Sequence, residues 1–328
     1  MMILDKLKAT IGRYELIKRG DLVLVAVSGG ADSVCLLYLL QALSRSLGFK
    51  LRIAHLDHML RRDSAKDAEF VRRLGAKLNI PVIAGKANIR RLAQKGSLEE
   101  IARNARLEFL FKAAKENKAD KIALAHNLDD QAETVLMRIL RGTGLYGLAG
   151  ILPKRKLYGF TVIRPLIRVR RREIEAFLRR KKIRPRIDKT NLQDVYSRNK
   201  LRNKLIPLLE REYNPAIKEA LSNMAEGIAF DYDYLSRQAL RLARGKRNRV
   251  NTAKFLKLHP AMQRLILRLH ISWLQGSTRR ITFTHIQEIE DLIANRPVNS
   301  IVDLPKGISV LKKATSILFY RRRGSTSC

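Results

Sequence analysis

A short loop rich in glycine and serine follows an apolar run near the start of the chain. It contains Ser28, Gly29, Gly30, Ala31, Asp32 and Ser33, and it comes directly after Leu22–Val27. Glycines let backbone N–H groups curve around an anion without Cβ clashes, and a helix starting behind the loop adds partial positive charge. Serine hydroxyls can donate to phosphate oxygens, and Asp32 could hold Mg²⁺ against them. The loop therefore predicts a phosphate site, although the same residue types also form ordinary turns.

Two carboxylates, Asp130 and Glu133, are placed where they could accept protons. A strand is expected over residues 122–125 and a helix over 129–141, and the spacing of three puts both side chains on one helix face. A carboxylate there could act as a general base. Acidic residues at a helix N-terminus are also favourable in themselves. Without further information, the pattern favours that structural explanation.

Histidines and arginines follow the other predicted elements. His55 and His58 close a strand over about residues 51–55, beside the phosphate loop, and His126 follows the strand at 122–125. The two strand-end histidines could contact a ligand or serve only the structure. Arg103 and Arg106 lie three apart on a predicted helix, hence on one face. That face could meet a phosphate or simply be solvated.

These residues are positioned by strands that alternate with helices over the first 150 residues. Such alternation implies right-handed βαβ units and a doubly wound parallel sheet, whose ligands lie beyond the carboxyl ends of its strands. Each unusual loop described above follows a strand. A helical linker and a smaller α+β part come after it. The predicted domains are residues 1–215, 216–250 and 251–328.

Composition narrows the class of partner. The 328 residues include 66 Lys and Arg against 30 Asp and Glu, a net charge of +36. This suggests a polyanionic partner, with nucleic acid ahead of an anionic membrane surface. The two cysteines cannot build a disulfide scaffold. Because no signal peptide or long apolar run is evident, we expect a cytoplasmic protein without a membrane partner.

The positive charge is densest between residues 164 and 204. This stretch holds sixteen Lys and Arg against four Asp and Glu. Arg198 and Arg202 would lie on one face if the segment is helical, and Asn199 between them could read a base edge. A solvated charged helix is the alternative. The enrichment favours contact of Arg198, Asn199 and Arg202 with RNA.

The motifs taken together resemble a known family. The Ser-Gly-Gly-x-Asp-Ser loop is similar to the pyrophosphate-binding loop (PP-loop) of N-type ATP pyrophosphatases, whose fold is Rossmann-like. Further segments, in this order, resemble the tRNA(Ile)-lysidine synthase family: residues 54–61, 97–106, 125–134, 141–144, 164–166 and 196–202. The resemblance covers about residues 21–210, and beyond that it is weaker.

The resemblance implies a reaction and its partners. Members adenylate the C2 oxygen of the wobble cytidine of a tRNA(Ile) with a CAU anticodon, using ATP and Mg²⁺. The ε-amine of free L-lysine then attacks C2 and AMP leaves, so that the tRNA reads AUA in place of AUG. We therefore expect ATP, Mg²⁺, tRNA(Ile) and free L-lysine as partners, and a homodimer is left open.

It also implies roles for individual residues. The loop Ser28–Ser33, with His55 and His126, would bind ATP, and Asp32 would also hold Mg²⁺. Asp130 and Glu133 would bind the lysine, with neither assigned as the base. Arg106 would counter phosphate charge, although the family often has Tyr after this arginine and Leu107 stands here. The catalytic set expected from the resemblance is Asp32, Arg106, Asp130 and Glu133.

Two other functions remain open at this stage. Another PP-loop enzyme could modify tRNA, but thiolating relatives commonly use a Cys-x-x-Cys pair, and Cys35 and Cys328 do not form one. A non-catalytic RNA-binding protein would explain the charge but not the carboxylates after predicted strands. Release of AMP that depends on tRNA and lysine would separate these possibilities.

Overall fold

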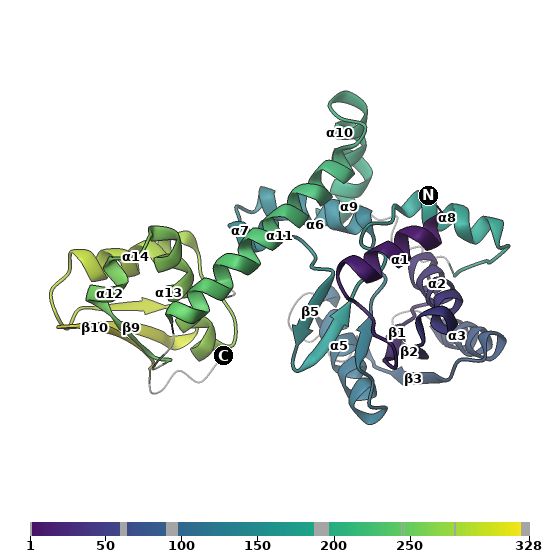
Figure 1. Cartoon of the computed structure of the whole chain (residues 1–328), viewed down its shortest axis with the longest axis horizontal. Helices are drawn as coiled ribbons and strands as arrows, with labels where there is room; N and C mark the ends of the chain where they lie inside the picture. Colours follow the sequence, from purple (N-terminus) through teal and green to yellow (C-terminus); the bar gives the residue numbers. More distant parts are fainter. Residues whose placement is uncertain are drawn as a thin grey trace. The chain divides into compact units, whose positions relative to one another are not determined.

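The chain forms two compact units, Met1–Ala229 and Phe230–Cys328, drawn in Figure 1. The computed structural model describes residues 2–59, 64–89, 98–186, 197–243, 245, 247–278 and 280–322. Each unit has its own sheet. The predicted fold class, a doubly wound α/β part followed by a smaller part with helices and strands, is confirmed. The three predicted domain limits stay a prediction.

A six-stranded sheet organises the first unit, in the order β3-β2-β1-β4-β6-β5. Strands β1, β2, β3, β4 and β6 run parallel, and β5 pairs antiparallel with β6 at one edge. The sequence interpretation did not foresee this edge hairpin. The strands are β1 (Leu22–Ala26), β2 (Lys50–Asp57), β3 (Val82–Lys86), β4 (Lys121–Ala123), β5 (Lys154–Leu157) and β6 (Phe160–Ile163).

The strand order places a switch point between β1 and β4. After β1 the chain builds β2 and β3 on one side, and it then crosses to β4 on the other side. Ligands of doubly wound sheets bind in the crevice where the order reverses, beyond the carboxyl ends of the strands. The phosphate loop follows β1, and the segment 124–133 follows β4. The fold thus brings both predicted motifs to one edge.

Helices cover both faces of this sheet, because successive residues of a strand point to opposite faces. Val23 and Val25 of β1 belong to a core with α1, α2, α3 and α8, whereas Leu24 belongs to a core with α5. Figure 1 shows α5 and this first group of helices on opposite sides of the strands. These helices are α1 (Ile3–Arg13), α2 (Ala31–Leu47), α3 (Ser64–Leu78), α5 (Leu98–Glu116) and α8 (Arg171–Arg180).

The remaining helices of the first unit surround the carboxyl edge or lead away from it. Helix α6 begins after an Asn127 cap and α11 packs against it through Leu221 and Ala225. A π-helical turn, η2, continues directly from α9, and such turns are frequent at functional sites. These elements are α6 (Leu128–Leu140), α7 (Leu145–Leu148), α9 (Ser197–Lys200), η2 (Leu201–Leu205), α10 (Ile206–Glu212) and α11 (Ile217–Leu242), which runs into the second unit.

The second unit is a four-stranded antiparallel sheet, in the order β7-β10-β9-β8, with helices packed on it. Its core joins Ile266 and Ile271 of α13 with Ile286 and Ile289 of α14 and with Phe319 of β10. Its elements are β7 (Arg249–Asn251), α12 (Thr252–Leu256), α13 (Pro260–Gln275), α14 (Phe283–Ala294), β8 (Ile301–Leu304), the 3₁₀ turn η3 (Pro305–Gly307), β9 (Ile308–Lys313) and β10 (Ser316–Arg321).

Among the described residues, no helix combines the length and the apolar character that crossing a bilayer would require.

Candidate active site

The phosphate loop joins β1 to α2 in a left-handed turn. Gly29 has a φ of 91°, which a residue with a Cβ adopts only with strain. Ser33 closes the loop, since its Oγ accepts from the Ser28 N–H at 3.2 Å and donates to the Gly30 carbonyl at 3.0 Å. Gly30 is the N-cap of α2, so the helix N-terminus points at the loop. The arrangement has the backbone geometry and the dipole that bind an anion.

Asp32, in the first turn of α2, is tied to two distant segments. Arg171 Nη1 donates to its Oδ2 at 2.6 Å, and Asn127 Nδ2 donates to its Oδ1 at 3.1 Å. Burial raises the pKa of Asp32 to about 6, against the opposing effect of the Arg171 charge. The carboxylate is therefore less well solvated than a surface Asp, and it gains from a cation brought close to it.

Asn127 connects this carboxylate to Asp130. The side chain of Asn127 accepts from the Asp130 N–H at 3.0 Å, while Asp130 Oδ2 accepts from the Asn127 N–H at 3.1 Å. This reciprocal cap starts α6. Because Asn127 also donates to Asp32, one buried side chain fixes the position of the phosphate loop relative to Asp130.

Glu133, one turn further along α6, is almost wholly buried, with 1% of its surface exposed. Arg202 donates to it from Nε at 2.6 Å and from Nη2 at 3.0 Å, and Arg198 donates from Nε at 2.7 Å. Such charge-assisted bonds satisfy a carboxylate that would otherwise be costly to bury. Glu133 thus anchors both arginines, which α9 and η2 present to it.

The same two arginines reach Asp130 less closely. Arg198 Nη2 lies 3.3 Å and Arg202 Nη2 3.6 Å from Asp130 Oδ1. Burial raises the pKa of Asp130, against the opposing effect of Arg198. Asp130 is therefore the more accessible carboxylate of the pair, with 19% of its side chain exposed against 1% for Glu133. Asn199, between the arginines in sequence, is buried.

Buried ring nitrogens surround the crevice without partners. Among the described residues, His55 Nε2, His58 Nδ1 and His126 Nδ1 are buried and make no hydrogen bond. The opposite nitrogen of His55, Nδ1, bonds the Val27 carbonyl at 2.8 Å, which fixes the ring beside the phosphate loop. Buried polar atoms are nearly always satisfied. Three orphaned nitrogens at the ends of β2 and β4 therefore indicate a polar ligand.

Unpaired positive charge gathers at the same edge. Arg103 and Arg106 in α5 are exposed and have no ion pair or hydrogen bond with any other described residue. Arg164, after β6, is buried, and its Nε has no partner within the described part of the chain. Burial, then the charges of Arg155 and Arg103, lower the pKa of Arg164 to about 10. These cations favour a ligand that is negatively charged.

His126 is neutral in this setting. Burial and the neighbouring Arg164 and Arg106 lower its pKa to about 3. The same causes, burial followed by the charge of Arg106, lower the pKa of His58. Both rings therefore offer one N–H donor and one acceptor near neutral pH, which suits hydrogen bonding to a nucleotide.

The structure brings most of the predicted residues together. The phosphate loop, His55, His126, Asp130 and Glu133 share the carboxyl edge of the sheet, and Arg198 and Arg202 bind the two carboxylates. The sequence interpretation missed Asn127, Arg164 and Arg171 as site residues. The pair Asn127–Asp130 has the spacing of a capping box, which could have indicated Asn127. Residues 60–61, 90–97 and 187–196, which include parts of the predicted motifs, lie outside the described residues.

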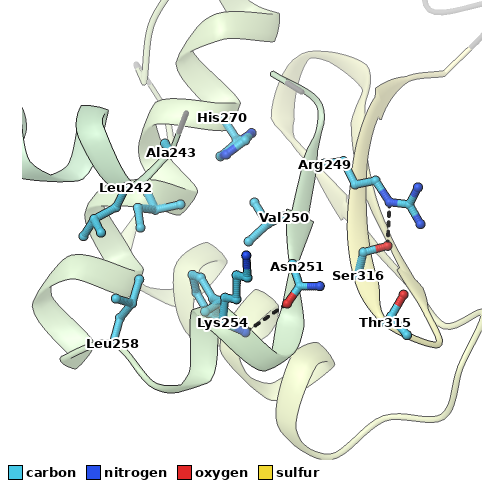
Figure 2. Close-up of a pocket in the computed structure, with 12 residues that line it drawn as sticks. Leu242, Ala243, Arg249, Val250, Asn251, Lys254, Leu258, His270, Thr315 and Ser316 are labelled. Carbon is cyan, nitrogen blue, oxygen red and sulfur yellow. Dashed lines mark hydrogen bonds between the residues drawn. The ribbon is translucent and has the colours of Figure 1, made fainter. Parts of the chain in front are cut away.

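A separate cavity of about 480 Å³ lies in the second unit. Its lining combines apolar side chains from α11, α12 and α13 with Lys254, Asn251 and the buried His270. Figure 2 shows Lys254 reaching toward Val250 and His270, whereas Arg249 points away and bonds Ser316. The cavity contains none of the residues to which the sequence assigns chemistry.

Comparison with known proteins agrees with this geometry. The sequence profile of the PP-loop domain matches residues 4–209, and that of the TilS substrate binding domain matches residues 251–321. Among solved structures, a U34-tRNA thiolase from Methanococcus maripaludis superposes with a TM-score of 0.58 at 19% identity, covering 69% of this chain and 77% of the thiolase. At that identity the likeness concerns the fold alone.

Curated relatives are more similar in sequence. The tRNA(Ile)-lysidine synthase of Clostridioides difficile (strain 630) is 38% identical over 97% of this chain and 70% of its own length. The enzyme of the same name from Caldanaerobacter subterraneus subsp. tengcongensis is 36% identical over 98% of this chain and 70% of its own length. The resemblance noted in the sequence is confirmed: this chain belongs to the tRNA(Ile)-lysidine synthase family.

Proposed function

We propose that the protein ligates free L-lysine to C2 of the wobble cytidine in tRNA(Ile) with a CAU anticodon, converting ATP to AMP and diphosphate. The observation that carries this proposal is the position of Asn127. It donates to Asp32 of the phosphate loop and caps Asp130, so the residues suited to ATP and those suited to an amine are neighbours. A two-step reaction on one base requires the ATP site and the amine site to lie next to that base.

In the first step, the C2 oxygen of the cytosine attacks the α-phosphorus of ATP, and the bond to the leaving diphosphate breaks. The loop 28–33 suits that diphosphate through its backbone N–H groups and the α2 N-terminus. The ring of His55 and the neutral ring of His126 would hydrogen-bond the nucleotide. Arg106, which has no ion pair with a described residue, would counter the charge that develops on phosphate.

Mg²⁺ fits the residues at the loop. Among the described residues, no cluster of three or more His, Cys, Asp or Glu side chains could hold a metal by itself. Mg²⁺ commonly takes one or two carboxylates together with substrate phosphates and water, and Asp32 supplies such a carboxylate beside the loop. When bound, the ion would neutralise phosphate charge. Asn127 and Arg171 hold the orientation of Asp32.

In the second step, the lysine ε-nitrogen attacks C2, the bond from C2 to the adenylated oxygen breaks, and AMP leaves with that oxygen. The amine loses protons in this step. A carboxylate must therefore hold the amine and accept its protons. We assign the lysine to Asp130 and Glu133, with Asp130 receiving an amine directly because it is more accessible and its arginine contacts are longer. Glu133 acts through the arginines that it anchors.

The substrate RNA would meet the basic residues around this edge. Arg198 and Arg202 spend only part of their five N–H donors on Glu133 and Asp130, so they can also contact phosphate, and Asn199 lies between them. A wobble base in an anticodon loop is unpaired, so it can enter such a crevice at a lower cost than a base in a duplex.

The test is direct. Purified protein is incubated with ATP, Mg²⁺, isotopically labelled L-lysine and a tRNA(Ile) transcript with a CAU anticodon, and the digested tRNA is analysed by mass spectrometry. Labelled lysidine at the wobble position is the expected result. AMP formed without lysine incorporation would require a different nucleophile. A folded protein that binds the tRNA but forms no AMP would be a non-catalytic RNA-binding protein.

A further inference from the structure

An exposed aromatic ring lies beside the proposed site. Tyr146, in α7, has 46% of its surface exposed. Arg155, in the edge strand β5, donates from Nη2 to the Tyr146 hydroxyl at 2.8 Å, and its guanidinium carbon lies 6.0 Å from the ring centroid. The hydrogen bond holds the hydroxyl edge of the ring, and the guanidinium lies beyond that edge. The pair therefore presents an oriented ring surface to solvent.

The turn that carries Tyr146 is held by two side chains of α6. Arg138 Nη1 donates to the carbonyls of Gly147 and Gly150, at 2.6 and 2.9 Å. Gln131 Oε1 accepts from the Ile151 N–H at 2.6 Å. A Cβ on Gly150 would lie only 2.6 Å from that same oxygen. These bonds hold the turn, and with it Tyr146, against α6, which is the helix that carries Asp130 and Glu133.

Arg155 reaches the same edge of the sheet from the other side. It pairs with Val162 of β6, and its neighbour Lys154 pairs with Ile163, the last residue before Arg164. Arg155 therefore lies at the carboxyl end of β6, near the buried Arg164. The lowered pKa of Arg164, to which burial and then Arg155 and Arg103 contribute, agrees with this closeness. The cation beside the Tyr146 ring thus lies close to a buried arginine of the proposed site.

The surrounding sequence has the composition of a surface that binds polyanions. The stretch 134–172 contains ten Lys and Arg and no Asp or Glu. An aromatic face bordered by cations is the arrangement that binds unpaired nucleotides, because each base can stack and each phosphate can be neutralised. Stacking of this kind tolerates any base, so it positions a strand rather than reading it.

We propose that Tyr146 and Arg155 form a stacking surface for the unpaired nucleotide next to the cytidine that is modified. The ring would stack on that base, and Arg155 would contact the adjoining phosphate. The surface would hold the anticodon loop open so that the neighbouring base can enter the crevice. This inference rests on the proposed function, since it concerns the same RNA.

The experiment uses an RNA stem-loop with a CAU anticodon and 2-aminopurine, whose fluorescence falls when it stacks. One probe carries it at the adenine that follows the cytidine, and a second carries it at the nucleotide before the cytidine. Binding is followed without ATP or lysine. With the wild-type chain we expect quenching at one of these positions. Tyr146→Ala should remove that quenching and raise the Kd about tenfold, as expected for one lost stack.

Two variants separate stacking from other effects. Tyr146→Phe keeps the ring and loses only the hydroxyl bond, so quenching should persist. Tyr158 lies in the β5–β6 hairpin that also carries Arg155, and 86% of its surface is exposed. It precedes β6, so it lies at the end of that strand opposite to the proposed site. The control variant Tyr158→Ala removes this ring. It should bind like the wild type. Thermal unfolding of each variant checks the fold, and the KM for ATP of Tyr158→Ala should equal that of the wild type.

Several results would overturn the inference. They are an absence of quenching with the wild type at both positions, unchanged quenching and Kd in Tyr146→Ala, or an equal loss in Tyr158→Ala. Lysidine formation by the wild type on full-length tRNA is measured separately. Lysidine without quenching would remove the stacking surface and keep the proposed function. Quenching that depends on Tyr146, with no lysidine, would remove the function and leave an RNA-binding surface.

Discussion

Arg202 and the buried Glu133, 69 residues apart in sequence, form a two-point ion pair in which Nε and Nη2 of the arginine meet the two carboxylate oxygens at 2.6 and 3.0 Å. Arg198 adds a third bond to Glu133. The residues assigned to RNA from the sequence are therefore bound to those assigned to lysine. The residues proposed for tRNA and those proposed for lysine share one ionic network, so we expect each ligand to affect the binding of the other.

The two carboxylates of this network should respond differently to neutralisation. Glu133→Gln removes a buried charge and leaves two guanidinium groups without their main partner, so we expect a loss of roughly 2–4 kcal/mol in the free energy of unfolding. Asp130→Asn keeps an acceptor for the helix cap, so it should unfold near the wild-type temperature but raise the KM for lysine at least tenfold. Denaturant unfolding and lysine titration measure the two effects. Equal stability losses would contradict this division of roles.

The raised pKa of Asp32 predicts a pH dependence with a definite sign. Because the folded-state pKa, about 6, lies above the value near 3.9 of an unfolded Asp, the native state binds more protons between these values. The contribution of Asp32 to stability is then present below pH 4 and is lost as the pH rises through 6. Asp32→Asn should remove this dependence and stabilise the protein by about 1–3 kcal/mol at pH 7.5.

Ionisation of Asp32 should raise activity, although it lowers the stability of the fold. The ionised carboxylate is the form that can hold Mg²⁺, so kcat/KM for ATP should fall below about pH 6, because it reports the free enzyme. Unfolding curves of wild type and Asp32→Asn at pH 4.5, 6 and 7.5 test the stability. A difference between the two proteins that does not change with pH would refute the assignment.

His126 should stay neutral through the range in which histidines usually titrate. Burial and its arginine neighbours lower its pKa to about 3, far under the ordinary value near 6.5. NMR spectra of protein labelled at histidine should show one ring, identified by its loss in His126→Gln, whose shifts stay constant from pH 5.5 to 8. A midpoint near 6.5 for this ring would show that the cluster does not suppress its charge.

Gly29 and Gly12 offer a matched pair of substitutions. Gly29 has a φ of 91° in the phosphate loop, so Gly29→Ala should cost about 1–2 kcal/mol and raise the KM for ATP. Gly12 lies inside α1 and is exposed, and an added Cβ would meet nothing within 4 Å. Gly12→Ala should therefore stabilise the fold by about 0.5–1 kcal/mol and leave the KM unchanged. A KM for ATP that responded equally to both would argue against a phosphate role for the loop.

Much of the architecture could be predicted from local patterns. The apolar run of β1, the glycine loop after it and the alternation with helices indicated a doubly wound sheet, because strand burial and tight turns depend on a few neighbouring residues. The edge strand β5, by contrast, begins with Lys154, Arg155 and Lys156. A strand open to solvent on its outer side needs no apolar run, so its sequence resembles a loop.

The phosphate loop could be recognised in the sequence because its chemistry depends on a few neighbouring residues, and the family resemblance added the two carboxylates for an amine. Which partners these residues bind depends on the fold. The bonds of Asp32 to Asn127 and Arg171 span 95 and 139 residues, and those of Glu133 to Arg198 and Arg202 span 65 and 69. Such contacts arise from the strand order and from burial, which no local pattern records. For the same reason, sequence reasoning favoured RNA contact for Arg198 and Arg202 and did not foresee that both bind the buried Glu133.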